Sequence, residues 1–141
     1  MTEFTFQTKI YATAQAIWEM YADFTKRRQW ETDLEYIKLE GDFSTGVSGT
    51  MKLVGQPEMP YTITSVILYK EYWDRTEIPG TGMAVCFGHE FMPNGNSTLV
   101  KVSAKLEKAT GEIIEEDILF LAQVFSDTPQ SMLAIKKIVE K

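Results

Sequence analysis

The chain has 141 residues and a formal net charge of −6 at neutral pH, with one histidine and one cysteine. The acidic balance argues against nucleic acid as a partner, because a surface that binds nucleic acid is basic. A single cysteine cannot form an internal disulfide, and one histidine with one cysteine cannot build a His/Cys zinc site. Gly41 and Gly46 have the spacing of a phosphate-binding loop, but that loop's lysine is missing. We therefore predict no metal and no cofactor.

The length suits one domain, residues 1–141, that can enclose a hydrophobic core. The longest uninterrupted apolar run, Ile118 to Ala122, is far too short to span a membrane. The first residues lack the basic and apolar regions of a signal peptide, and the lone cysteine fits a reducing compartment. We expect a cytoplasmic protein without a membrane span, and we predict no oligomeric state.

Alternating apolar residues from Phe4 to Ile10 predict a first strand over residues 3–11. Thr13 caps a predicted helix with helically spaced apolar residues, and a second short helix is expected before the next strand. We interpret the basic cluster at residues 26–28 as a solvated helix end that the helix dipole stabilises. Glu31, Asp33 and Glu35 are interpreted as solvated carboxylates on the exposed face of the second strand.

The middle of the chain is predicted to be a meander of strands joined by tight turns. Asn94-Gly95 is the strongest hairpin signal, since both central positions of that turn need positive φ. Pro79-Gly80 suits the centre of a type II turn. The predicted strands after the first cover residues 34–39, 49–54, 61–68, 72–78, 83–92 and 100–107.

The segment Gly111–Lys141 has helical spacing and is apolar around much of its first half. Acidic residues gather at its start and lysines at its end, which suits the helix dipole. Thr128 precedes Pro129 and is therefore expected to leave the helical region. We predict a sharp kink or two helices, lying across the concave face of a curved antiparallel sheet. The fold class is α+β.

This order of elements resembles the START-like superfamily (SRPBCC), also called the helix-grip or polyketide cyclase/dehydrase-like family. The local patterns that carry the resemblance are the strand-to-helix step Ile10–Trp18, the pair Asp23 and Trp30, the hairpin segment His89–Gly95 with Thr98 and Val100, and the amphipathic C-terminal helix. The resemblance implies a helix-grip fold of about seven strands around the terminal helix. It also implies a hydrophobic pocket between them that binds lipids, polyketides, hormones or quinones, with catalysis in a minority of members.

Three functions follow as hypotheses. The first is binding of a small hydrophobic molecule of lipid, polyketide or aromatic type in that pocket. The second is a cyclase- or dehydratase-like enzyme that uses the same pocket, and the third is a protein-interaction module of co-chaperone or toxin type.

His89 is the residue on which the first two hypotheses divide. Strand alternation places it on the apolar face of its strand, between Phe87 and Phe91. Desolvation there should lower its pKa. It is a candidate for orienting a ligand's polar group or for acid/base catalysis, and the alternative is a core histidine that a carbonyl or tyrosine satisfies. The predicted ligand-binding residues are Trp30, Met51, Tyr61, Trp73, Phe87, His89, Phe91, Leu121 and Phe125.

Overall fold

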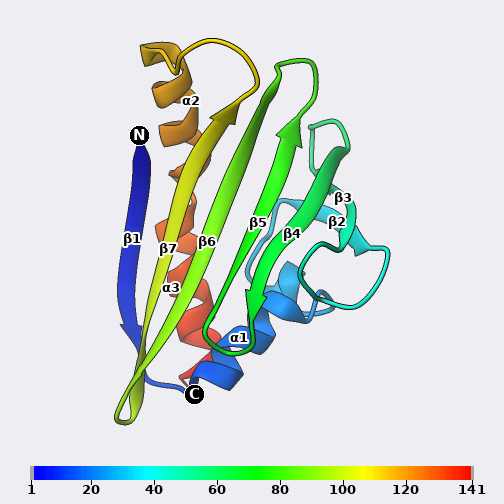
Figure 1. Cartoon of the computed structure of the whole chain (residues 1–141). Coiled ribbons are helices and arrows are strands. Elements are labelled where there is room, and N and C mark those ends of the chain that lie inside the picture. Colours follow the sequence, from blue (N-terminus) through cyan, green and yellow to red (C-terminus); the bar gives the residue numbers. More distant parts are fainter. Residues whose placement is uncertain (1, 141) are drawn as a thin grey trace.

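The computed structural model describes residues 2–140 and contains a seven-stranded sheet with the order β1-β7-β6-β5-β4-β3-β2 (Figure 1). Every neighbouring pair is antiparallel. The prediction of an antiparallel sheet of about seven strands is therefore confirmed. The strands are β1 (Glu3–Ile10), β2 (Leu34–Leu39), β3 (Ser48–Leu53), β4 (Met59–Ile67), β5 (Glu71–Ile78), β6 (Met83–Asn94) and β7 (Ser97–Lys108).

Two short helical segments connect β1 to β2, as predicted. The first is α1 (Ala14–Ala22), and the second, η1 (Arg27–Gln29), is a single 3₁₀ turn. Thr13 caps α1, because its hydroxyl accepts a hydrogen bond from the Ala16 amide at 3.1 Å. The apolar stripe of α1 is buried against the sheet.

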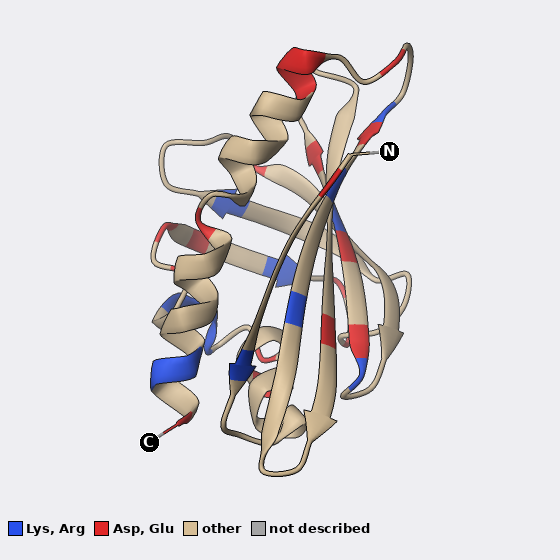
Figure 2. Cartoon of the chain, turned by 90° about the vertical axis from the view of Figure 1, so that its left-hand side faces the viewer, with Lys and Arg blue, Asp and Glu red and all other residues tan. Residues whose placement is uncertain are grey.

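The C-terminal segment forms two helices, α2 (Glu115–Phe125) and α3 (Thr128–Val139), that lie along one side of the sheet (Figure 2). The predicted kink is confirmed, whereas the expectation that Thr128 leaves the helical region is wrong, since α3 begins at Thr128. Ser126 and Asp127 also keep right-handed helical dihedrals. The break therefore comes from Pro129, which cannot donate to the hydrogen-bond ladder. Lys141, the last residue of the predicted helical segment, lies outside the described residues.

Acidic residues gather at the start of α2 and basic residues at the end of α3, as the charge colouring of Figure 2 shows. Asp117 anchors this start to the sheet. Its Oδ2 accepts hydrogen bonds from the Ile114 amide at 2.9 Å and from Nζ of Lys108 on β7 at 2.8 Å. The helix dipole and this contact both fix where α2 begins.

The buried residues form two clusters on the face of the sheet that the helices cover. The larger packs α1, α2 and α3 against β1, β5, β6 and β7. The smaller gathers Leu34, Met51, Met59, Tyr61 and Ile63 from β2, β3 and β4. Across residues 2–140, no helix is both long and apolar enough to cross a membrane.

Candidate functional site

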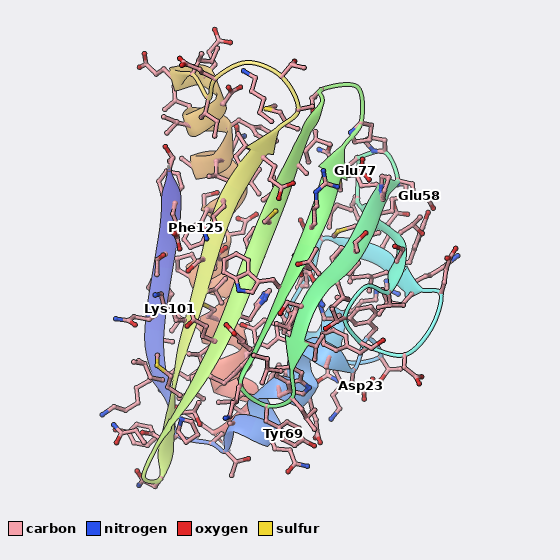
Figure 3. All side chains as sticks on the ribbon, in the orientation of Figure 1. Asp23, Glu58, Tyr69, Glu77, Lys101 and Phe125 are labelled. Carbon is pink, nitrogen blue, oxygen red and sulfur yellow. The ribbon has the colours of Figure 1, made fainter. Side chains whose placement is uncertain are left out.

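A cavity of about 600 Å³ lies between the helix-covered face of the sheet, η1 and the break between α2 and α3. Its inner walls are aromatic or aliphatic and come from α1, the sheet and α2. Its rim consists of the β3–β4 loop, the β5–β6 turn and Asp127 with Thr128. The labelled residues Glu58 and Glu77 in Figure 3 mark the β3–β4 loop and the end of β5, at the end of the sheet where the cavity lies. The apolar lining residues include Trp30, Met51, Met59, Val85, Phe87, Val102, Phe120, Val124 and Met132.

Five of the nine residues predicted to bind a ligand line this cavity: Trp30, Met51, Tyr61, Phe87 and His89. The alternation predicted for β6 is correct, because Val85, Phe87 and His89 all face the cavity. Tyr61 also faces inward and is only 2% exposed. Their role in ligand binding stays a prediction.

Trp73 is placed wrongly by the sequence analysis, because it lies on the opposite face of the sheet. Its neighbours Tyr72 and Asp74 are the residues of β5 that face inward, and alternate residues of a strand point to opposite faces. The indole lies flat over Gly88, where a Cβ atom would come within 2.3 Å of the ring. Nζ of Lys105 lies 4.8 Å from the ring centroid. The indole is therefore a packed part of the outer surface.

Phe91, Leu121 and Phe125 do not line the cavity either, since they belong to the packed core. Phe125 stacks between Phe4 of β1 and Phe87, with centroids 6.1 and 6.5 Å away, and Figure 3 labels it beside β1 and β7. On α2, the cavity instead meets Phe120 and Val124. The cavity-facing stripe of the helix is thus displaced by one residue from the predicted one.

The prediction that the basic cluster at residues 26–28 is solvated is wrong for Arg27, whereas Arg28 is exposed and Lys26 is half-buried. Arg27 is 6% exposed and lines the cavity. Its Nη1 donates to the Tyr21 carbonyl at 3.1 Å, and its Nε and Nη2 each lie 3.0 Å from Oε1 of Glu31. The Tyr21 carbonyl belongs to the last turn of α1, where carbonyls lack partners within the helix. Arg27 therefore joins α1 to the segment before β2.

Glu31 and Asp33 are likewise not on the second strand as predicted, because β2 begins only at Leu34. Glu31 pairs with Arg27, and both acidic residues line the cavity. The neighbouring Trp30 is attached to α1, because its indole Nε1 donates a hydrogen bond to the Met20 carbonyl at 2.8 Å. The Arg27 guanidinium carbon lies 5.0 Å from the Trp30 ring centroid.

A buried carboxylate, Asp74 of β5, lines the cavity and is 5% exposed. Its Oδ2 accepts a hydrogen bond from the Tyr61 hydroxyl at 2.8 Å. Burial raises the pKa of Asp74 to about 7, although the Tyr61 hydrogen bond and the Arg27 charge act in the opposite direction. Burial also raises the pKa of the Tyr61 phenol well above its ordinary value, so the phenol remains the proton donor of this pair.

The His89 ring is buried beside the same polar groups. It stacks on the Tyr72 ring at a centroid distance of 4.0 Å, and its Nδ1 lies 3.4 Å from the Tyr72 carbonyl oxygen. A carbonyl only accepts hydrogen bonds, so Nδ1 carries the proton and Nε2 is an acceptor in the neutral ring. Burial, followed by the Arg27 charge, lowers the pKa of His89 to about 3. The direction expected from the two flanking phenylalanines is thus the one found.

The polar residues of the cavity that the sequence analysis missed include Arg27, Glu31 and Asp74. Two signals for them were present. Arg27 and Glu31 have the four-residue spacing of a helical ion pair. Asp74 falls on the same face of β5 as the apolar Tyr72, where an acidic residue is unusual. Among the described residues, no group of three or more His, Cys, Asp or Glu side chains could hold a metal ion.

The arrangement places a hydrogen-bonded carboxyl group, a paired guanidinium and a neutral imidazole together in a cavity whose walls are largely apolar. Such a site can accept protons and hydrogen bonds from a small molecule and can stabilise negative charge that develops on one.

Solved structures with the same architecture include Ara h 8.0201, with a TM-score of 0.76 and 12% identity over 98% of this chain and 97% of that chain. A second is norcoclaurine synthase from Thalictrum flavum in complex with dopamine and hydroxybenzaldehyde, with a TM-score of 0.71 and 17% identity over 98% and 86% of the two chains. A third is CalU16 from Micromonospora echinospora, with a TM-score of 0.69 and 13% identity over 97% and 73%.

No family model matches the sequence, and no curated protein matches it. The likeness to solved structures nevertheless extends over almost the whole chain, from the first strand to the terminal helices. It agrees with the antiparallel sheet, the early helix and the bent C-terminal helix described above. These likenesses, at 12–17% identity, show the fold alone: the chain has the predicted helix-grip arrangement of a curved antiparallel sheet around C-terminal helices.

Proposed function

We propose that the protein binds a small, neutral and largely apolar molecule in the cavity, with a polar group of that molecule beside Tyr61, Asp74 and His89. The cavity itself carries this proposal: about 600 Å³, with largely aromatic and aliphatic walls, a buried polar cluster of Arg27, Asp74 and His89, and further polar residues at the rim. Ligand pockets in proteins have this size and this division between apolar walls and a few polar groups.

The electrostatics of the cavity favour a neutral ligand. The protein lowers the pKa of His89 and raises that of Asp74, so it disfavours an added positive and an added negative charge alike. The one cationic side chain at the inner end, Arg27, already has Glu31 as its partner. A charged ligand would lose its hydration without gaining a free counter-ion.

The ligand class that fits best is an aromatic or polyketide-like molecule with a hydroxyl or carbonyl group. Tyr61, Trp30, Phe87 and Phe120 offer ring faces and edges to a flat molecule. The complex of norcoclaurine synthase with dopamine and hydroxybenzaldehyde supports the proposal, because it shows small aromatic molecules in a protein of this fold. A fatty acid fits less well, since its carboxylate would need a free cation. A cytoplasmic location and a single domain stay predictions.

Native mass spectrometry of protein purified from its host tests the proposal by detecting a retained small molecule. Displacement of an apolar fluorescent dye then gives its affinity. Phe120→Trp, which adds bulk to the cavity wall, should weaken dye binding at least several-fold. The matched control is Leu119→Trp, on the exposed side of the same helix, which should leave binding unchanged. Equal dye affinity in both variants would contradict the proposal and favour a protein-interaction role.

A further inference from the structure

Asp74 stands apart from the other charged groups of the cavity. Arg27 and Glu31 form an ion pair, whereas none of the ion pairs among residues 2–140 includes Asp74. Its carboxyl group accepts a hydrogen bond from the Tyr61 phenol at 2.8 Å and another from the Phe87 backbone amide. A buried carboxyl group without a cationic partner costs stability, and such groups gather at sites of acid/base chemistry.

We propose that Asp74 is a general base in this cavity and that the protein catalyses proton removal from a carbon acid, a small planar molecule whose C–H bond is acidified by an adjacent carbonyl group. This inference rests on the proposed binding function, because the substrate would occupy the same cavity. It assigns a reaction class that binding alone does not require.

The step balances without any further reactant. The C–H bond breaks, its proton forms an O–H bond with the Asp74 carboxylate, and its electron pair moves to the substrate's carbonyl oxygen as an enolate. In a substrate with a C=C bond beyond that carbon (a β,γ-unsaturated carbonyl compound), the enolate is a dienolate; return of the proton to its γ-carbon re-forms the carbonyl group and moves the C=C bond to the α,β position. The net change is an isomerisation, so no oxidant or reductant is needed.

Arg27 is placed to stabilise the negative charge that develops on the substrate oxygen. Its contacts with Glu31, the Tyr21 carbonyl and Tyr61 use at most four of the five guanidinium N–H groups. At least one N–H therefore remains for a ligand oxygen. A fixed donor in a site shielded from water stabilises an oxyanion more strongly than water does.

Asp74 has the protonation behaviour that a base needs, because its pKa of about 7 leaves a basic carboxylate available near neutral pH. His89 is less suited, since its pKa of about 3 makes the ring a weak base. The titratable or charged groups that act on Asp74 or share its cavity include Tyr61 on β4, Tyr72 on β5, Cys86 and His89 on β6, Tyr21 on α1, Arg27, Glu31 and Asp33 before β2, and Asp127 at the cavity rim. Of these, the hydrogen bond from Tyr61 lowers the Asp74 pKa most.

The test uses 5-nitrobenzisoxazole, a flat aromatic carbon acid. Removal of its C–H proton forms a nitrile, breaks the N–O bond and releases a coloured phenolate. The whole protein should convert it with saturation kinetics, at a rate that rises with pH to a plateau, with a midpoint near 7. Asp74→Asn, which preserves shape but removes the base, should lose about 10²-fold in kcat/KM. Circular dichroism checks that this variant folds.

Tyr61→Phe separates positioning from catalysis. The phenol acts on Asp74, so its loss should move the midpoint of the pH–rate profile upward, and the rate at the high-pH plateau should fall less than in Asp74→Asn. The matched control is Glu90→Gln, a carboxylate on the outer face of β6 near Lys101, which should change neither rate nor profile. A role of Tyr61 in folding alone would not move the midpoint.

Binding of the probe distinguishes the two proposals and is measured by the quenching of tryptophan fluorescence, to which Trp30 in the cavity wall contributes. A probe that binds but reacts no faster with wild type than with Asp74→Asn would overturn the catalytic inference and leave the binding proposal standing. A wild-type rate without a midpoint near 7 would overturn it even if Asp74→Asn fails to fold. A probe that neither binds nor reacts would contradict both.

Discussion

The layer under α1 and the layer under the break between α2 and α3 rest on the same face of one sheet. Under α1 the space is filled. The Trp18 ring forms edge-to-face contacts with Phe43, Tyr69, Tyr72 and Phe91, at ring-centroid distances of 5.5–6.0 Å. Under the break, the walls carry Met51, Met59 and Val85, and the space between them is a cavity of about 600 Å³. The same sheet thus supports a packed core at one end and a hollow site at the other.

The difference lies in which side chains the helices direct inward. α1 contributes Trp18 and Tyr21, whose rings fill the space, and Arg27 then closes the end of that helix. The two-residue connection between α2 and α3, together with the first residue of α3, instead places Asp127 and Thr128 at the rim of the hollow end. Apolar packing dominates stability at the first end. At the hollow end, the polar groups form hydrogen bonds and an ion pair with one another. The space beside them is not filled by side chains and can hold a ligand.

The sharpest test of this contrast lies within α2, where Leu121 is fully buried and Val124 lines the cavity. Leu121→Ala should lower the free energy of unfolding by about 2–5 kcal/mol, because it leaves a new void in a packed core. Val124→Ala should cost under about 1 kcal/mol, since it only enlarges an existing space. Urea denaturation measures both, and similar losses would show that the two stripes of α2 are packed alike.

A second test uses the opposed pKa changes of Asp74 and His89. Between pH 5 and 6.5 the folded protein keeps a proton on Asp74 that the unfolded chain has lost, so stability falls as pH rises. Over the same range the unfolded chain protonates His89 and the folded protein does not, so stability rises with pH. In the wild type, these two contributions to the pH dependence of stability cancel, and only the contributions of other titratable groups remain.

Single variants should expose each slope. In Asp74→Asn only the His89 contribution remains, so the free energy of unfolding should rise by up to about 1.4 kcal/mol per pH unit. His89→Gln leaves Asp74, and stability should fall with pH by a similar amount. Denaturation at several pH values across this range provides the measurement. Slopes of the same sign in the two variants would show that one of these groups is not buried as described.

Much of the fold followed from local patterns in the sequence. Alternation located the strands, Thr13 located the start of α1, and Asn94-Gly95 located the β6–β7 hairpin, because each depends on neighbouring residues alone. The turn itself is one residue further on than predicted: Asn94 ends β6, and of the predicted pair Gly95 alone has a positive φ. The break before α3 was also found, although Pro129 causes it through a missing donor and not through an extended Thr128.

The site was harder to predict because it depends on pairings between distant segments. The cluster at residues 26–28 consists of basic residues, which are usually exposed. Arg27 is buried because it pairs with the otherwise unpartnered carbonyl of Tyr21 and with Glu31. Trp73 and Asp74 are adjacent in β5, so choosing the wrong one of two faces exchanged a buried carboxylate for a surface indole. A rotation of one residue in α2 likewise exchanged Phe120 for Leu121.

The smallest expected effects concern two buried tyrosines with different partners. The Tyr61 hydroxyl donates to Asp74 at 2.8 Å, whereas the Tyr72 hydroxyl has no hydrogen-bond partner among the described residues. At pH 8, where Asp74 is ionised, Tyr61→Phe should cost about 1–3 kcal/mol, because it leaves a buried carboxylate without its donor.

Tyr72→Phe should change stability by less than about 0.5 kcal/mol, or raise it slightly, because it removes a buried polar group that gains nothing in the folded state. Its ring would still stack on His89 and contact Trp18. Urea denaturation of both variants at pH 8 provides the comparison, and repetition at pH 5, where Asp74 is protonated, should reduce the loss only for Tyr61→Phe. A loss at Tyr72 as large as that at Tyr61 would mean that the Tyr72 hydroxyl has a partner in solution, such as a water molecule that reaches the polar end of the cavity.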